Sequence, residues 1–198
     1  MSGKTAISGS AGQPPGAGKV VDDTRRWLET AVIGLNLCPF AKAVHASRRI
    51  RYCVSDAQSE EALLADLSRE LLELHAADPL ICETTLLIHP RVLSDFLEYN
   101  EFLDMAEATV ATLGLTGEIQ IASFHPRYQF ADSGPNDIEN FTNRSPYPML
   151  HLLRESSIER AMADAPDSAA IYERNIETLR RLGHAGWQRL WPTRPDED

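Results

Sequence analysis

Three short apolar segments separated by long helical patterns constrain this fold more than any other feature of the sequence. The segments RRIRYCVS (48–55), ETTLLIHP (83–90) and EIQIASFHP (118–126) have the length and residue types of β-strands. Helices of the intervening length connect parallel strands as crossovers. The sequence therefore predicts an α/β fold with a small sheet of three or four strands, at least partly parallel, flanked by about five helices. A mixed α+β sandwich is the alternative.

Two strong helical patterns lie between these strands. Residues 59–77 place leucines on one face, begin with acidic residues and stop at Asp78-Pro79. Residues 92–114 form a second long pattern, which ends at a glycine. The leucines that share one face of the first pattern are Leu63, Leu67, Leu71 and Leu74.

A further helix is predicted near the N-terminus, over residues 21–37, with Asp22 or Asp23 as its N-cap. The stretch before it is rich in Gly, Ala, Ser and Pro, and it has little apolar surface to offset the entropy of ordering. The last residues are also expected to be loose. The predicted organisation is a disordered tail over 1–19, a single globular domain over 20–192 and a disordered tail over 193–198.

Two helices are predicted in the C-terminal quarter. The first begins at Ser145 or Pro146 and ends before Pro166, because serine caps a helix and proline fits its first turn. The second begins near residue 167 or 168 and ends at Gly183. After this helix, we expect the chain to pack against the rest of the domain through Trp187 and Trp191.

Composition and charge narrow the class of protein. A chain with a net charge of −10 lacks the broad positive surface that binds nucleic acid, so we expect no nucleic-acid partner. There is no apolar run of about 18 residues and no apolar core of the signal-peptide type, so we expect no membrane partner and a cytoplasmic location. The cysteines include no CxxC pair, which favours a reducing compartment over disulfides. They are Cys38, Cys53 and Cys82.

Two predicted strands end alike, in His-Pro. If these strands run parallel, His89 and His125 emerge at the same edge of the sheet, where open α/β sheets bind ligands. The alternative is that proline simply terminates each strand and that each histidine is an ordinary loop residue. Residues 124–148 then form a long irregular loop with its own aromatic anchors, and such loops inside compact domains are usually functional.

The end of this loop has the residues of an anion site. The expected helix start at Ser145 offers free N–H groups, and Arg144 can form a forked contact with a carboxylate or phosphate. Asn140, Asn143 and Tyr128 can orient a small anionic ligand. Alternatively, Arg144 bridges to a loop aspartate and the asparagines tie the loop down. The remaining candidate binding residues, which face either the pocket or solvent, are His151 and Arg154.

Cys38 is the candidate reactive thiol. Pro39 favours a helix start directly after it, and an N-cap position makes a thiolate more available. A thioredoxin-like turn is not matched, because Ala41 stands where a resolving cysteine would be. The alternative is a buried, inert thiol, which is also the expectation for Cys53 and Cys82.

Three motifs, in this order and spacing, carry a resemblance to a known family. The stretches GLNLCPFA, FHPRYQF and NRSPYPMLHLLRE resemble those of the bacterial domain-of-unknown-function family 1415 over roughly residues 22–183. The resemblance implies one domain in a bacterial cytosolic protein, and it implies no particular activity.

These features support three hypotheses. The first is a small-molecule enzyme in which Cys38 is the nucleophile or redox thiol and His125 the general base, with an unknown cofactor requirement. The second is a transition-metal site of Cys38, His125 and either His89 or His151, although no short-spaced ligand pair supports it. The third is a non-catalytic sensor of an anionic ligand, or a partner-binding module, in which Cys38 belongs to the core.

Overall fold

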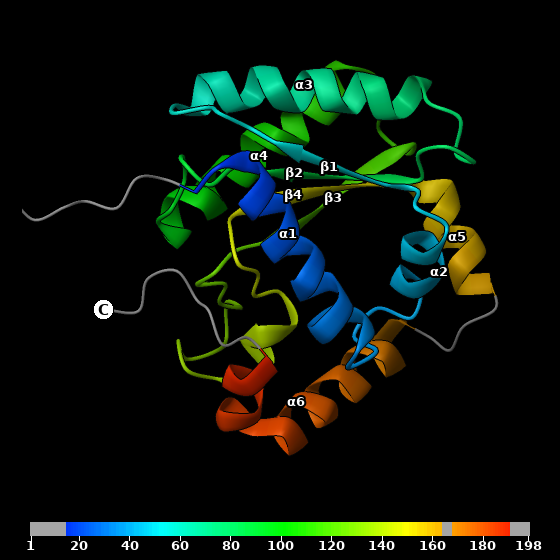
Figure 1. Cartoon of the computed structure of the whole chain (residues 1–198). Coiled ribbons are helices and arrows are strands. Elements are labelled where there is room, and N and C mark those ends of the chain that lie inside the picture. The colour runs from blue at the N-terminus through cyan, green and yellow to red at the C-terminus, as the bar shows by residue number, and fades with distance from the viewer. Residues whose placement is uncertain (1–14, 164–167, 191–198) are drawn as a thin grey trace, which may run out of the picture.

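A four-stranded sheet lies between two layers of helices in the computed structural model, which describes residues 15–163 and 168–190 (Figure 1). This confirms the predicted α/β class. The strands are β1 (Ile50–Val54), β2 (Thr84–Ile88), β3 (Ile119–Phe124) and β4 (Met149–Arg154). The helices are α1 (Ala17–Trp27), α2 (Ala41–Ala46), α3 (Glu60–Ala76), α4 (Phe96–Thr112), α5 (Glu155–Ala163) and α6 (Ser168–Leu190), with a π-helix η1 (Leu28–Ile33) and a 3-10 helix η2 (Ile138–Thr142).

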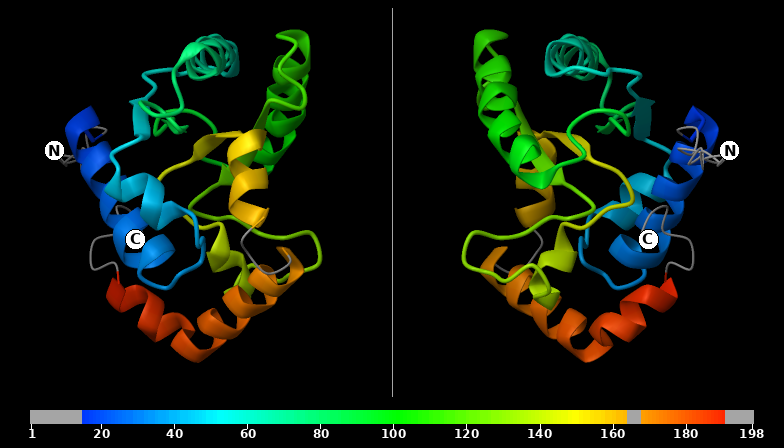
Figure 2. Two further views of the ribbon diagram at one scale, coloured as in Figure 1. Left: turned by 90° about the vertical axis from the view of Figure 1, so that its right-hand side faces the viewer. Right: turned by 90° about the vertical axis from the view of Figure 1, so that its left-hand side faces the viewer.

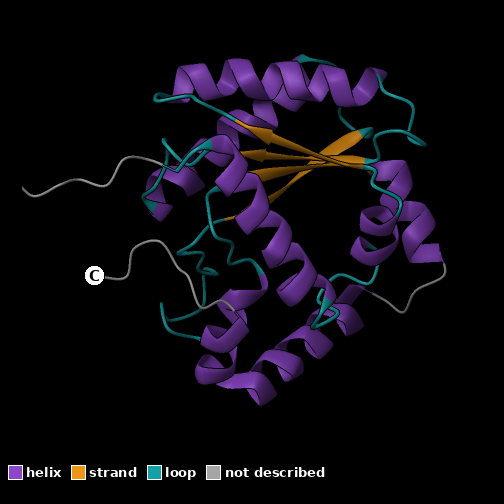
Figure 3. Ribbon diagram, in the orientation of Figure 1, coloured by secondary structure: helices purple, strands orange, loops and turns teal. Residues whose placement is uncertain are grey.

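The order of the strands is β1-β2-β4-β3. β1 pairs with β2 in parallel, while β4 is antiparallel to both of its neighbours, β2 and β3. β2 and β3 therefore run in the same direction within the sheet, whose strands are the orange arrows of Figure 3. His89 follows β2 and His125 follows β3, so both leave the sheet at the same edge, as predicted.

The predicted helix from Ser145 is wrong over its first half, because residues 149–154 form β4. This strand is central, and Met149, Leu150 and Leu152 are fully buried. A strand covered on both faces shows an apolar run without alternation, and its leucines also favour a helix. Pairing with distant strands overrides that local preference. Only α5, which begins at Glu155, is helical in this segment.

The N-terminal helix starts earlier than predicted. α1 begins at Ala17 with Gly16 as its N-cap, so Asp22 and Asp23 lie inside the helix and cap nothing. α1 then continues directly into the π-helix η1. Residues 1–14 of the predicted tail, the whole predicted tail 193–198 and Trp191 lie outside the described residues. The extent of the single domain stays a prediction.

The other local predictions agree closely with the structure. Ser59 caps α3 by accepting the Ala62 N–H at 3.2 Å, and the four predicted leucines of α3 are buried. α6 is broken at Gly183, where φ is 65°, at the predicted end of the last helix. Beyond the break Trp187 packs edge-on against Phe141, with ring centroids 5.2 Å apart.

Each face of the sheet has its own hydrophobic core. The upper core joins the sheet to α3 and α4, and the lower core joins it to α1, η1 and α6. Figure 2 shows the bent α6 closing the lower side of the molecule, opposite the sheet. Along β4, Leu150 and Leu152 belong to the upper core and Met149 to the lower one. Because side chains alternate along a strand, His151 faces the lower layer with Met149.

Candidate functional site

Asn140 is an internal anchor of the long loop. Its side chain is fully buried, and its Oδ1 accepts hydrogen bonds from the Phe130 N–H at 3.0 Å and from Ser133 Oγ at 2.6 Å. Its Nδ2 donates to the carbonyl of Gly134 at 2.8 Å. These bonds engage both ends of the amide, so Asn140 holds the loop rather than facing a ligand.

Arg144 also ties the loop together. Its Nε donates to the carbonyl of Tyr128 at 3.3 Å and its Nη2 to that of Pro135 at 2.5 Å. The guanidinium lies over the ring of Phe141, with Cζ 4.2 Å from the ring centroid. The backbone carbonyl of Arg144 accepts the indole N–H of Trp27 at 2.9 Å. These contacts fit the structural alternative for Arg144 better than ligand binding.

The remaining loop candidates make comparable contacts. Asn143 Nδ2 donates to the carbonyl of Ser123 at 3.1 Å, which fastens the loop to β3. Ser145 is buried and its hydroxyl donates to the carbonyl of Tyr147 at 2.7 Å, so it precedes a strand and caps no helix. The expected anion site at a helix N-terminus is therefore not formed there. The ring of Tyr128 packs against those of Phe96 and Phe130.

Both ring nitrogens of His125 are engaged. Nδ1 accepts the Arg127 N–H at 3.0 Å, which requires the proton to be on Nε2, and Nε2 contacts the carbonyl of Leu93 at 3.2 Å as a donor. The ring is fully buried, and burial lowers its pKa to about 4. His125 is neutral at pH 7, but it has no free nitrogen with which to accept a proton.

His89 lies close to His125 and is equally enclosed. Its Nδ1 donates to the carbonyl of Val92 at 3.0 Å, and both histidine rings lie against Tyr99, with centroids 5.8 and 5.0 Å away. Burial lowers the pKa of His89 to about 4. Its buried Nε2 has no hydrogen-bond partner among the described residues.

Cys38 does not meet His125. The thiol is half-buried and packs against the lower core, whereas His125 packs against Phe96 and Tyr99 on the upper side. The two predicted catalytic residues therefore pack against different cores. Cys38 is also not an N-cap, because the N-cap of α2 is Phe40.

His151 is the predicted site residue with an open nitrogen. The Thr84 hydroxyl donates to the carbonyl of Leu152 at 2.5 Å, so the contact of 2.8 Å between Thr84 Oγ1 and His151 Nε2 is donated by the imidazole. Nδ1 is then unprotonated, and among the described residues it has no partner and is not sealed from solvent. Burial lowers the pKa of His151 to about 4.

Arg154 has a structural position. Its Nη2 donates to the carbonyls of Leu74 and Ala77 at the end of α3, the latter at 2.7 Å. A cation at this end satisfies carbonyls that have no partner within the helix. Arg154 therefore acts as a C-terminal cap for α3.

The turn that carries Cys38 is held by contacts that local patterns do not reveal. Gly34 follows the π-helix, and a Cβ there would lie 2.3 Å from the carbonyl oxygen of Thr30. Asn36 adopts a positive φ of 54°. The carbonyl of Leu37 accepts the buried amide of Asn175 from α6 at 2.8 Å. π-Helical turns are rare and often occur near functional positions.

The metal hypothesis gains no support from the described part of the chain. It contains no group of three or more His, Cys, Asp or Glu side chains that could hold an ion. In the same residues, no helix is long and apolar enough to cross a membrane.

Comparison with known proteins identifies the family. The family described as "Protein of unknown function (DUF1415)" matches residues 19–189. No curated protein and no solved structure gave a match. Because the matched region covers most of the 198 residues, the chain belongs to the DUF1415 family.

Proposed function

We propose that this protein is a small-molecule enzyme whose site lies below the sheet, with Cys38 as nucleophile or redox thiol and His151 as its base. The observation that carries the proposal is the open Nδ1 of His151 on the central strand. His151 replaces His125 in this role, since both nitrogens of His125 are engaged.

The chemistry of the imidazole suits this role. At neutral pH the ring is uncharged and Nδ1 keeps a lone pair for a proton, but the lowered pKa makes it a weak base until a negative charge forms beside it. Thr84 holds the Nε2–H and so fixes the tautomer and the ring orientation. A thiolate formed beside the ring would offset the cost of charging it, because an opposite charge nearby favours the imidazolium.

Alkylation of the three cysteines by iodoacetamide tests the proposal. Cys38 should react fastest, while Cys53 should be slow because burial raises its pKa to about 12. His151→Gln should slow the reaction at Cys38 by roughly tenfold or more, the size expected of a positioned base. His75→Gln is the matched control, since His75 is exposed on α3 and pairs with Glu118. Equal rates at all three thiols would remove the nucleophile.

A non-catalytic ligand-binding protein is the second candidate. The packing of Cys38 against the lower core favours it, since a thiol among apolar neighbours is often inert. In that case Cys38→Ser would leave ligand affinity nearly unchanged, whereas the enzyme proposal requires loss of turnover.

A further inference from the structure

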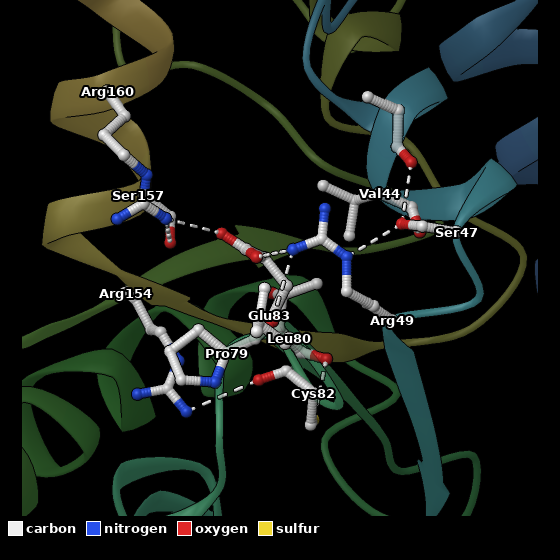
Figure 4. Close-up of polar contacts among 12 residues, drawn as sticks. Val44, Ser47, Arg49, Pro79, Leu80, Cys82, Glu83, Arg154, Ser157 and Arg160 are labelled. Carbon is white, nitrogen blue, oxygen red and sulfur yellow. Dashed lines mark hydrogen bonds and ion pairs between the residues drawn. The ribbon is translucent and has the colours of Figure 1, made fainter.

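A buried carboxylate links two arginines at the edge of the sheet opposite His89 and His125. Figure 4 shows Glu83 between Arg49 and Arg160. Arg49 Nη1 binds Glu83 Oε2, and Arg160 Nη2 lies 3.1 Å from Glu83 Oε1. The side chain of Glu83 is 9% exposed, that of Arg49 24% and that of Arg160 63%. The cluster thus runs from the interior to the surface.

Neighbouring hydroxyl groups fix the orientation of both guanidinium groups. Arg49 Nε donates to Ser47 Oγ at 2.8 Å, and Arg160 Nη2 donates to Ser157 Oγ at 3.0 Å. Within the described ranges, no hydrogen bond reaches Nη2 of Arg49 or Nη1 of Arg160, and neither atom is sealed from solvent. Two oriented cations therefore keep donor groups available.

The local charge is positive although the chain as a whole is acidic. Two guanidinium groups share one carboxylate, which leaves an excess of one positive charge in a protein of net charge −10. Arg154 lies close behind, with Nη2 3.4 Å from the carbonyl of Cys82, and it forms no ion pair with any described residue. The surplus charge favours an anion.

We propose that Arg49 and Arg160 bind the phosphate group of a small ligand through these free donors. Planar guanidinium groups match the oxygens of phosphate and form strong, charge-assisted hydrogen bonds with it. Ser157 supplies a further hydroxyl donor, whereas the Ser47 hydroxyl already donates to carbonyls of α2. Glu83 is the carboxylate with which a bound phosphate competes for the two cations. The site involves neither Cys38 nor His151, so it stands or fails independently of the proposed function.

Titration of the full chain with sodium phosphate at constant ionic strength, with sodium chloride as reference, tests the site. Amide NMR signals of residues 47–49, 83 and 157–160 should shift in a saturable way. Arg160→Gln should weaken binding by roughly tenfold or more, since it removes a charge-assisted hydrogen bond. Arg180→Gln is the control, because Arg180 is similarly exposed, at 66%, and pairs with Glu139 elsewhere.

Two further measurements separate a ligand site from a purely structural ion pair. Glu83→Gln removes the competing negative charge at constant size, so it should bind phosphate at least as tightly as the unchanged chain. Sodium acetate should bind more weakly than phosphate. The proposal is overturned if phosphate acts no differently from chloride, if Arg160→Gln binds it equally well, if Glu83→Gln loses binding, or if acetate binds as tightly.

Discussion

Thr84 and His151 are joined across β2 and β4 by a hydrogen bond of 2.8 Å between Thr84 Oγ1 and His151 Nε2. The same hydroxyl donates to the carbonyl of Leu152, so one threonine decides which imidazole nitrogen carries the proton. Nδ1 of His151 is therefore the nitrogen that carries no proton.

Replacement of Thr84 by valine, which preserves shape, should release this constraint. The imidazole N–H would lose its acceptor, and an unsatisfied buried donor costs about 1–3 kcal/mol, whereas the Leu152 carbonyl keeps its place in the ladder opposite Thr85. We expect a lower free energy of unfolding in urea and an altered ¹⁵N tautomer pattern for His151. Thr112→Val on the exposed side of α4 is the control. An unchanged tautomer pattern would show that Thr84 does not set the protonation of the ring.

Acid should destabilise the protein between about pH 6.5 and pH 4. His89, His125 and His151 have folded pKa values of about 4, below the unfolded value near 6.5, because burial disfavours the charged form. The unfolded chain therefore binds more protons in this window, and stability falls as pH falls, by up to about 1.4 kcal/mol per pH unit for each histidine. Urea unfolding measured at half-unit intervals should show this slope. A flat profile over the window would contradict it.

Gly34→Ala should distort the turn before Cys38. The added Cβ would lie 2.3 Å from the Thr30 carbonyl oxygen, which belongs to the backbone of η1 and cannot move cheaply. We expect a loss of at least about 1 kcal/mol in the free energy of unfolding. Gly18→Ala in α1 is the matched control, because its Cβ meets nothing within 4 Å and alanine favours a helix. Equal stability of the two variants would argue that the turn adapts freely.

Asn140→Ala should loosen the long loop without unfolding the sheet. The change removes three hydrogen bonds and leaves the Phe130 N–H without its acceptor, at a cost of about 2–4 kcal/mol. We expect faster proteolysis between residues 126 and 143 than in Asn136→Ala, which alters an exposed asparagine of the same loop. Similar cleavage rates in the two variants would show that Asn140 is dispensable for loop order.

The local elements were predictable because their causes are local. β1, β2 and β3 are short apolar runs, and α3 has both its apolar face and its serine cap within the segment. β4 was missed because its strand character comes from pairing with two distant strands. The same leucine-rich segment, considered alone, satisfies the pattern of a helix.

The candidate site was less predictable from the sequence, because the same polar residue types suit both anion binding and stabilisation of a loop. The polar groups of Asn140, Arg144 and Ser145 suit an anion, but the loop's own carbonyl and N–H groups engage them first. His151 could not be assigned by spacing, because its orientation depends on β4 being a strand. Only the tertiary fold brings together Arg49, Glu83 and Arg160, and no sequence motif indicates that they are close.

The late position of β4 in the chain governs how the sheet can assemble during synthesis. β3 pairs with β4 and with no other described strand, whereas β1 and β2 pair directly. A nascent chain that has left the ribosome only as far as Pro148 can join the first two strands, but β3 remains an unpaired edge. Completion of the sheet must wait until β4, which ends at Arg154, has been translated and has left the ribosome.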